Sequence, residues 1–171
     1  MQHPLEFIRQ RVEKEVLSNS GVLLKSVNYD EPKGDPGLFG PDSICWQVHG
    51  DFSSMIVGGF SALLLQMLHP LALAGVWDHS NFRDDMMGRL RRTAQFVAAT
   101  TYAGTEDAAA IISKVRGIHE RVQGTTPNGQ HYSAMDPDLL TWVHVAEARS
   151  FLNARLLYSN LKLNLRQRDQ Y

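Results

Sequence analysis

One of the seven histidines in this chain of 171 residues, His119, has the setting of a metal ligand. It continues an apolar stripe with helical spacing and stands one turn after Val115. A neutral imidazole on an apolar helix face can offer one nitrogen to a metal while a hydrogen bond holds the other. A haem iron needs such a ligand on a rigid element with a wide apolar face. A core histidine bonded to a backbone carbonyl would produce the same pattern.

A group of arginines crowds the start of the helix expected before this one, namely Arg89, Arg91 and Arg92. Arg89 lies one turn before Thr93, whereas Arg92 and Thr93 are adjacent and project about 100° apart. Partly desolvated guanidinium groups match carboxylates bidentately, as haem propionates would require. A solvated basic turn is the alternative interpretation of the same cluster.

Three further histidines could line a metal site: His69, His79 and His144. Asp78 could orient the ring of His79, and Glu147 stands three residues after His144 as a second carboxylate–imidazole pair. His69 precedes a proline, which favours an extended or turn conformation. No pair of these histidines has HExxH or similar spacing, so structural roles for all three remain open.

The composition places these side chains in a single globular domain over residues 1–171. The chain is 43% hydrophobic and 20% charged, which argues against disorder. Its net charge of −1 gives no general attraction to nucleic acid or to anionic lipid. The single cysteine, Cys45, excludes an internal disulfide and fits a reducing compartment, so we expect a cytoplasmic protein. We interpret Cys45 as a small apolar filler that has no histidine nearby in the sequence.

An uncharged stretch runs from Phe52 to Trp77 and is long enough to suggest a membrane span. Glycines, His69 and Pro70 interrupt it, and Pro70 should kink or end a helix there. We therefore expect a buried, broken helix in place of a span, with peripheral contact with a membrane left open.

Helical signals cover most of the remaining chain. Apolar spacing predicts an amphipathic helix over residues 5–16. Acidic and hydroxyl side chains at their starts predict three more helices, over residues 84–102, 105–123 and 136–158. Asn128-Gly129 is a two-residue turn signal that predicts a short hairpin. The predicted fold is therefore all-α, with at most this hairpin.

Three ordered stretches resemble a known family. They are GGFSALLLQMLHPLALAGVWDHSNF from Gly58, GRLRRTAQFVAATTYAG from Gly88 and KVRGIHERVQGTTPNGQHYSAMDPDLLTWVHVAEARSFL from Lys114. They are similar to MpaB-type oxygenases, which are relatives of the latex-clearing rubber oxygenases and of a fungal oxygenase of the mycophenolic acid pathway. The recognisable part spans residues 41–158. Because family members usually continue past the position of Tyr171, we expect the chain to lack C-terminal helices of the family.

The resemblance implies a helical fold with haem b, acting with dioxygen on a hydrophobic small molecule such as an isoprenoid alkene. His119 falls on the proximal iron ligand, and Arg89 and Thr93 fall on the arginine and threonine of an R-x-x-[K]-T segment. Arg92 stands where rubber oxygenases have a distal lysine, and arginine is a poor iron ligand. We expect Arg92 or Thr93 to donate to bound oxygen or to a propionate, and Arg89 to hold a propionate.

His79 and His144 complete the candidate cofactor-binding residues, and His119 is the candidate metal ligand. The chain offers no match for the acidic base of the family. Two other functions therefore remain open, namely a haem-binding or sensing module without turnover and a helical interaction protein without a cofactor. Missing helices would also expose an apolar patch and favour a homo-oligomer.

Overall fold

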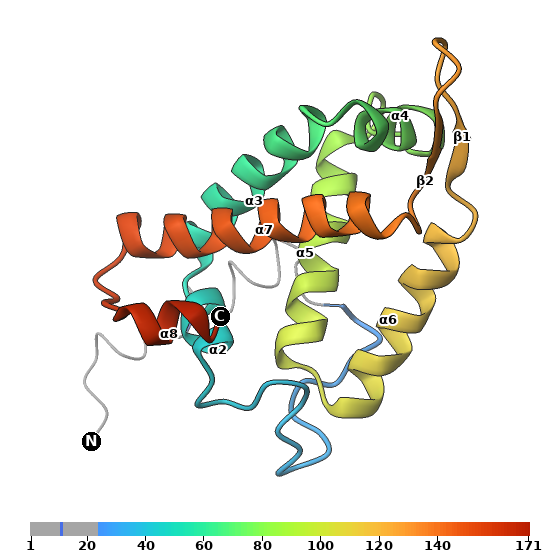
Figure 1. Ribbon diagram of the computed structural model, residues 1–171. Helices are drawn as coiled ribbons and strands as arrows, with labels where there is room; N and C mark the ends of the chain where they lie inside the picture. The colour runs from blue at the N-terminus through green and yellow to red at the C-terminus, as the bar shows by residue number, and fades with distance from the viewer. Residues whose placement is uncertain (1–10, 12–23) are drawn as a thin grey trace, which may run out of the picture.

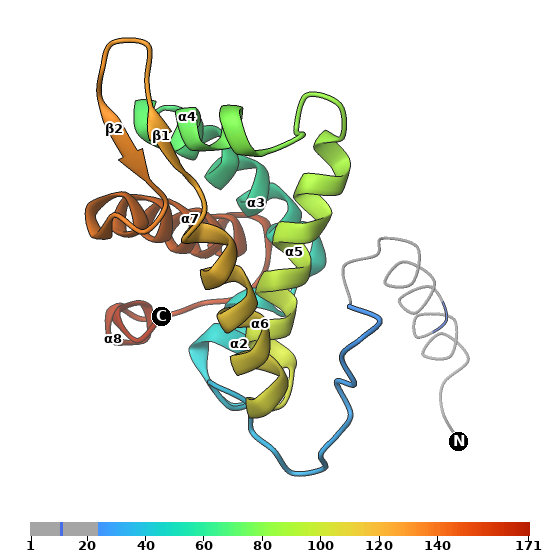
Figure 2. The ribbon, with the colours of Figure 1, turned by 90° about the vertical axis from the view of Figure 1, so that its right-hand side faces the viewer.

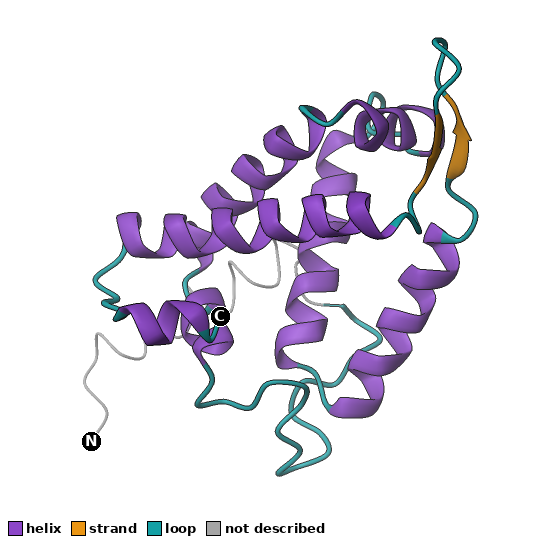
Figure 3. Cartoon of the chain, in the orientation of Figure 1, coloured by secondary structure: helices purple, strands orange, loops and turns teal. Residues whose placement is uncertain are grey.

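The computed structural model describes residues 11 and 24–171, whose regular secondary structure is helical apart from one short hairpin (Figures 1 and 3). The elements in chain order are α2 (Ile44–His49), α3 (Phe52–Met67), α4 (Pro70–His79), α5 (Met86–Tyr102), α6 (Thr105–His119), β1 (Gln123–Thr125), β2 (His131–Ser133), α7 (Pro137–Tyr158) and α8 (Leu165–Asp169). The two strands pair antiparallel around the predicted Asn-Gly turn. The all-α prediction with one hairpin is confirmed, whereas the helix expected over residues 5–16 lies outside the described residues.

Helices α3 and α4 fill the uncharged stretch, and they meet at an angle of 103°. The break is where the sequence predicts it, because Pro70 has no N–H to continue the hydrogen-bond ladder of α3. No described helix is long and apolar enough to cross a membrane by itself, and α3 with α4 reaches that length and composition only as this bent pair.

The expectation that this pair of helices is buried is wrong for one face of α3. Its buried residues, Ser54, Gly58 and Ala62, recur every four positions and lie toward α7. On the opposite face, Leu64 and Leu68 are 66% and 73% exposed. A single packing partner covers only one side of a helix, so an uncharged composition does not by itself bury the other side.

The packing of α3 against α7 requires a glycine at their crossing. A Cβ added at Gly58 would lie 2.8 Å from Cδ1 and 2.9 Å from Cα of Phe151. Near this crossing, α2 and α7 form a core of Val48, Phe151 and Leu152, joined by Leu163 from the segment between α7 and α8. The absence of a side chain at Gly58 therefore lets two long helices come together beside the core.

Helices α5 and α6 form an antiparallel pair joined at Gly104 (Figure 2). The carboxylate of Asp85 caps α5, as predicted, by accepting a 2.7 Å hydrogen bond from the backbone N–H of Gly88. Helix α6 ends at His119 and not near Gln123, because the chain enters β1 there. Gly124, the first residue after the predicted helix, lies in β1.

Candidate functional site

His119 is the last residue of α6 and is half-buried. Ile112 and Val115 share its helix face, and Ile112 is 41% exposed, so this face keeps uncovered apolar surface. The imidazole makes no hydrogen bond or ion pair within residues 24–171. Burial lowers the pKa of His119, which keeps the ring uncharged at neutral pH. An uncharged, unpartnered imidazole beside apolar surface has the properties of a metal ligand.

Arg89 is hydrogen-bonded to a side chain of α3 and is influenced by the charge of a side chain of α7. Its Nη2 donates a 3.2 Å hydrogen bond to Oε1 of Gln66 on α3. Burial, followed by the nearby charge of Arg92, lowers the pKa of Arg89. Glu147 on α7 is close enough for the charge of Arg89 to oppose the rise that burial causes in the pKa of Glu147. The hydrogen bond connects α5 with α3, and sequence reasoning named neither Gln66 nor the influence of Arg89 on Glu147.

Arg92 and Thr93 make local contacts on α5 and at its start. The guanidinium of Arg92 donates to Oδ1 of Asn81 at 3.1 Å and lies 3.5 Å from Oδ2 of Asp85. Its side chain is 56% exposed, so the ion pair with Asp85 is worth little. The hydroxyl of Thr93 donates to the backbone carbonyl of Arg89 at 3.2 Å. The guanidinium of Arg92 is therefore the more readily available of the two groups for a ligand.

His79 contacts Asp78 only through a third side chain, so the direct pair expected from the sequence is wrong. The buried Tyr132 of β2 donates a 2.6 Å hydrogen bond to Oδ2 of Asp78, and its hydroxyl lies 3.2 Å from Nε2 of His79. The same Nε2 donates to the carbonyl oxygen of Gln123 at 3.1 Å. Burial and the hydrogen bond to Asp78 raise the pKa of Tyr132 to about 12. This cluster anchors the hairpin to α4.

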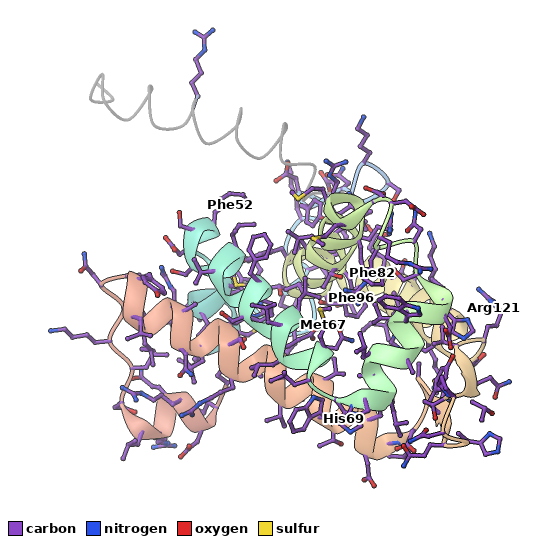
Figure 4. The ribbon with its side chains drawn as sticks, turned by 90° about the horizontal axis from the view of Figure 1, so that it is seen from above. Phe52, Met67, His69, Phe82, Phe96 and Arg121 are labelled. Atoms are coloured by element: carbon purple, nitrogen blue, oxygen red, sulfur yellow. The ribbon has the colours of Figure 1, made fainter. Side chains whose placement is uncertain are left out.

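The other two histidines do not form the expected metal set. His144 is exposed whereas Glu147 is half-buried, and no hydrogen bond joins them, so that predicted pair is also wrong. His69 lies at the bend between α3 and α4 (Figure 4), where its buried Nδ1 has no hydrogen-bond partner and its ring centroid is 5.5 Å from that of Trp142. Within the described residues no three His, Cys, Asp or Glu side chains gather as a metal site.

His49 is a half-buried polar residue with several partners that sequence reasoning missed. Its Nδ1 lies 2.8 Å from Oγ1 of Thr101 and 3.7 Å from Sγ of Cys45, and its Nε2 lies 2.8 Å from the hydroxyl of Tyr171. Burial lowers the pKa of His49 to about 4. The interpretation of Cys45 as lacking a nearby histidine is therefore wrong. The four-residue spacing from Cys45 to His49, one helical turn, was the signal that could have found this contact.

The described residues fit a haem better than a bare metal ion. A protein-only site needs three or more converging ligands, whereas a porphyrin supplies four nitrogens itself and needs one or two axial ligands from the protein. His119 could hold the iron of such a group, because its ring is uncharged and has no hydrogen-bond partner within residues 24–171. The exposed part of Ile112, on the same helix face, offers apolar surface for a porphyrin.

Comparison with known protein families assigns this all-helical domain to a class of proteins. The family model described as "ER-bound oxygenase mpaB/B'/Rubber oxygenase, catalytic domain" matches residues 46–171. The chain belongs to this family, and its fold is that of an oxygenase catalytic domain. The match continues past residue 158, where the resemblance seen in the sequence ended, and includes α8. No curated protein and no solved structure matches the chain.

Proposed function

We propose that this chain is a haem b-dependent oxygenase that uses dioxygen on a hydrophobic substrate, in which His119 would hold the haem iron. The observation that supports the proposal most directly is the imidazole of His119. It is half-buried on an apolar helix face, has a lowered pKa and has no hydrogen-bond partner among residues 24–171. Family membership supplies the oxygenase class. The ligand and the cofactor are inferred from the residues.

Bound haem would supply the redox chemistry that activates dioxygen, and the protein would supply binding and orientation. His119 would hold the iron through one ring nitrogen. Arg92 would donate to a propionate, exchanging a weak exposed ion pair with Asp85 for a charge-assisted hydrogen bond. Thr93 can donate to a ligand only by releasing the carbonyl oxygen of Arg89, so its part is secondary.

A visible spectrum of the purified protein after haem reconstitution tests whether His119 holds the haem. We expect a Soret band that the substitution His119→Ala removes while the far-UV circular dichroism of the helices stays unchanged. His131→Ala is the matched control, because His131 is exposed on the hairpin and its side chain bonds, among residues 24–171, only to Thr125, at 2.9 Å. An unchanged Soret band in the His119→Ala protein would refute this assignment. No band in the parent protein would leave the helical interaction protein as the better account.

Oxygen consumption separates an oxygenase from a haem-binding module without turnover. The haem-loaded protein is supplied with a reductant and a panel of terpenoid alkenes, and dioxygen uptake is measured against a no-substrate control. We expect substrate-dependent uptake that is lost together with the Soret band in His119→Ala. A haem-loaded protein that consumes no oxygen with any alkene in the panel would favour the binding module.

A further inference from the structure

The tip of the hairpin carries the one Asn-Gly pair of the sequence, Asn128-Gly129. The tip projects away from the helices (Figures 1 and 2), and both residues are exposed to water. They lie in a β-turn that the backbone N–H of Gly129 closes with a 2.9 Å hydrogen bond to the carbonyl oxygen of Thr126. Gly129 has a φ of 86°, in the left-handed region that favours glycine. The conformation of the turn therefore requires a glycine directly after Asn128.

An asparagine followed by glycine can react with its own backbone. The backbone nitrogen of Gly129, after losing its proton to base, attacks Cγ of Asn128 and forms a cyclic imide. The Cγ–Nδ2 bond breaks, and Nδ2 takes up a proton from water and leaves as ammonia. A second water molecule then opens the imide, so that a carboxyl group replaces the amide without any oxidant or reductant. No Cβ crowds the attacking nitrogen, and a Cβ added at Gly129 would meet nothing within 4 Å.

Thr126 binds both groups that take part in this reaction. Its carbonyl oxygen accepts the N–H proton of Gly129 that base must remove, and its hydroxyl donates to Oδ1 of Asn128. The hydroxyl also accepts a 3.0 Å hydrogen bond from the backbone N–H of Gln130 and lies 3.0 Å from the carbonyl oxygen of that residue. For Cγ to reach the backbone nitrogen, the side chain of Asn128 must rotate and give up its bond to Thr126. The folded turn therefore exposes a reactive pair and restrains it.

We propose that Asn128 is a site of spontaneous deamidation, and that the hydroxyl of Thr126 slows this modification in the folded protein. The inference goes beyond the proposed function and does not depend on it, because no cofactor or substrate takes part. The chemistry is that of the backbone and of one side chain.

The modification has a structural consequence for the hairpin. Opening of the imide at Cγ gives aspartate, whereas opening at the backbone carbonyl carbon gives an isoaspartyl residue. Either product adds a negative charge at neutral pH. The isoaspartyl product also adds a methylene group to the main chain between Thr126 and Gly129. We therefore expect it to weaken the pairing of Thr125 with His131 next to the turn.

Peptide mapping by mass spectrometry follows the modification in the full chain at neutral pH. Samples are taken at intervals, and the gain of mass from amide to carboxyl is assigned to single asparagines. We expect Asn128 to convert well before Asn160, which is also exposed but is followed by Leu161. The leucine side chain crowds the attacking nitrogen, so Asn160 is a control within the same molecule. Conversion of Asn128 no faster than that of Asn160 would overturn the assignment of this site.

Two substitutions of Thr126 test the role of its hydroxyl. Thr126→Val removes the hydroxyl and keeps the branched shape, and it should speed the conversion of Asn128 roughly fivefold, as the loss of one hydrogen bond would. Thr126→Ser keeps the hydroxyl and should convert at close to the parent rate. Neither substitution should change the rate at Asn160. An unchanged rate in Thr126→Val, or a Thr126→Ser protein as fast as Thr126→Val, would overturn the role of the hydroxyl.

Opening of the whole hairpin is the other way to speed the reaction, and Tyr132→Phe measures it. This variant loses the hydrogen bond from Tyr132 to Asp78 and keeps every side chain of the turn. We expect a smaller increase in the rate at Asn128 than Thr126→Val gives. Equal increases in the two variants would show that opening of the hairpin sets the rate, and they would overturn the role of Thr126. Far-UV circular dichroism checks that each variant keeps its helices.

Discussion

The hydroxyl of Tyr171 donates a 2.8 Å hydrogen bond to Nε2 of His49 and ties residue 171 to α2. The direction of the bond follows from the other side of the ring. Thr101 donates its own proton to the carbonyl oxygen of Val97 at 2.7 Å, so its oxygen accepts from the Nδ1–H of His49. The imidazole also packs edge-on against Phe151 of α7. One neutral ring therefore connects α2, α5, α7 and residue 171.

Acid should unfold the protein through His49. Burial lowers the pKa of His49 from 6.5 to about 4, so between these values the unfolded chain binds a proton that the folded chain does not. The free energy of unfolding should fall by about 3 kcal/mol as the pH drops through this window. Above pH 6.5 the protein should keep the whole of this contribution from the neutral His49. Urea denaturation at a series of pH values measures this loss.

The substitution His49→Gln isolates this contribution. A glutamine amide can still donate to Thr101 and accept from Tyr171, but it does not titrate. The variant should therefore lose less stability than the parent protein between pH 6.5 and pH 4. His144→Gln is the control and should keep the parent slope, because that imidazole is exposed. Equal slopes for all three proteins would contradict a neutral, buried role for His49.

Local signals in the sequence predicted the fold well, because caps, turns and prolines act within a few residues. Asp136 accepts hydrogen bonds from the backbone at the start of α7, and Asn128-Gly129 turns the hairpin. The short helices α2 and α8 escaped prediction because five or six residues are too few to show periodicity. The exposed face of α3 escaped it because burial depends on which partners pack against a helix.

Gly58 should tolerate no side chain, whereas the neighbouring Gly59 should tolerate a small one. In Gly58→Ala the new Cβ would lie within 2.9 Å of Phe151, partly against its backbone, so α3 and α7 must move apart. We expect a loss of about 2 kcal/mol in the free energy of unfolding. Gly59→Ala is the matched variant, with its nearest contact at 3.8 Å, and should gain about 0.5–1 kcal/mol from helix propensity. Urea denaturation compares the two, and equal effects would contradict the close crossing.

The hydroxyl of Tyr132 should stabilise the hairpin against α4. Tyr132→Phe removes the 2.6 Å hydrogen bond to Asp78, whose exposed carboxylate water can then solvate. We expect a loss of about 1 kcal/mol in the free energy of unfolding, together with faster amide exchange in β1 and β2. Tyr158→Phe, which alters a phenol that is 66% exposed, should change neither quantity. Unchanged exchange in Tyr132→Phe would mean that the hairpin is held by its apolar contacts alone.

The candidate site was only partly predictable, because its groups meet through tertiary packing. The helical stripe located His119, and its half-buried ring has no hydrogen-bond partner in the described part of the chain. Glu147 was assigned to His144 because they are three residues apart, yet Glu147 is half-buried and influenced by the charge of Arg89, whereas His144 is exposed. Spacing within one helix cannot reveal which side chain on another helix will be opposite. The contacts between helices can be seen only in the three-dimensional structure.

Bound haem should stabilise the folded protein if His119 is its ligand. A ligand that binds only the folded state raises the free energy of unfolding by about 2.7 kcal/mol at a free concentration of one hundred times its Kd. We expect haem b in such excess to raise the midpoint of urea denaturation of the parent protein and of His131→Ala. The His119→Ala protein should show a much smaller rise, since the bond to the iron would be lost and only the contact of Arg92 and apolar contacts would remain. Denaturation is measured by circular dichroism, which does not depend on the colour of the haem. An equal rise in all three proteins would therefore show that haem binds at another site, whatever the Soret band shows.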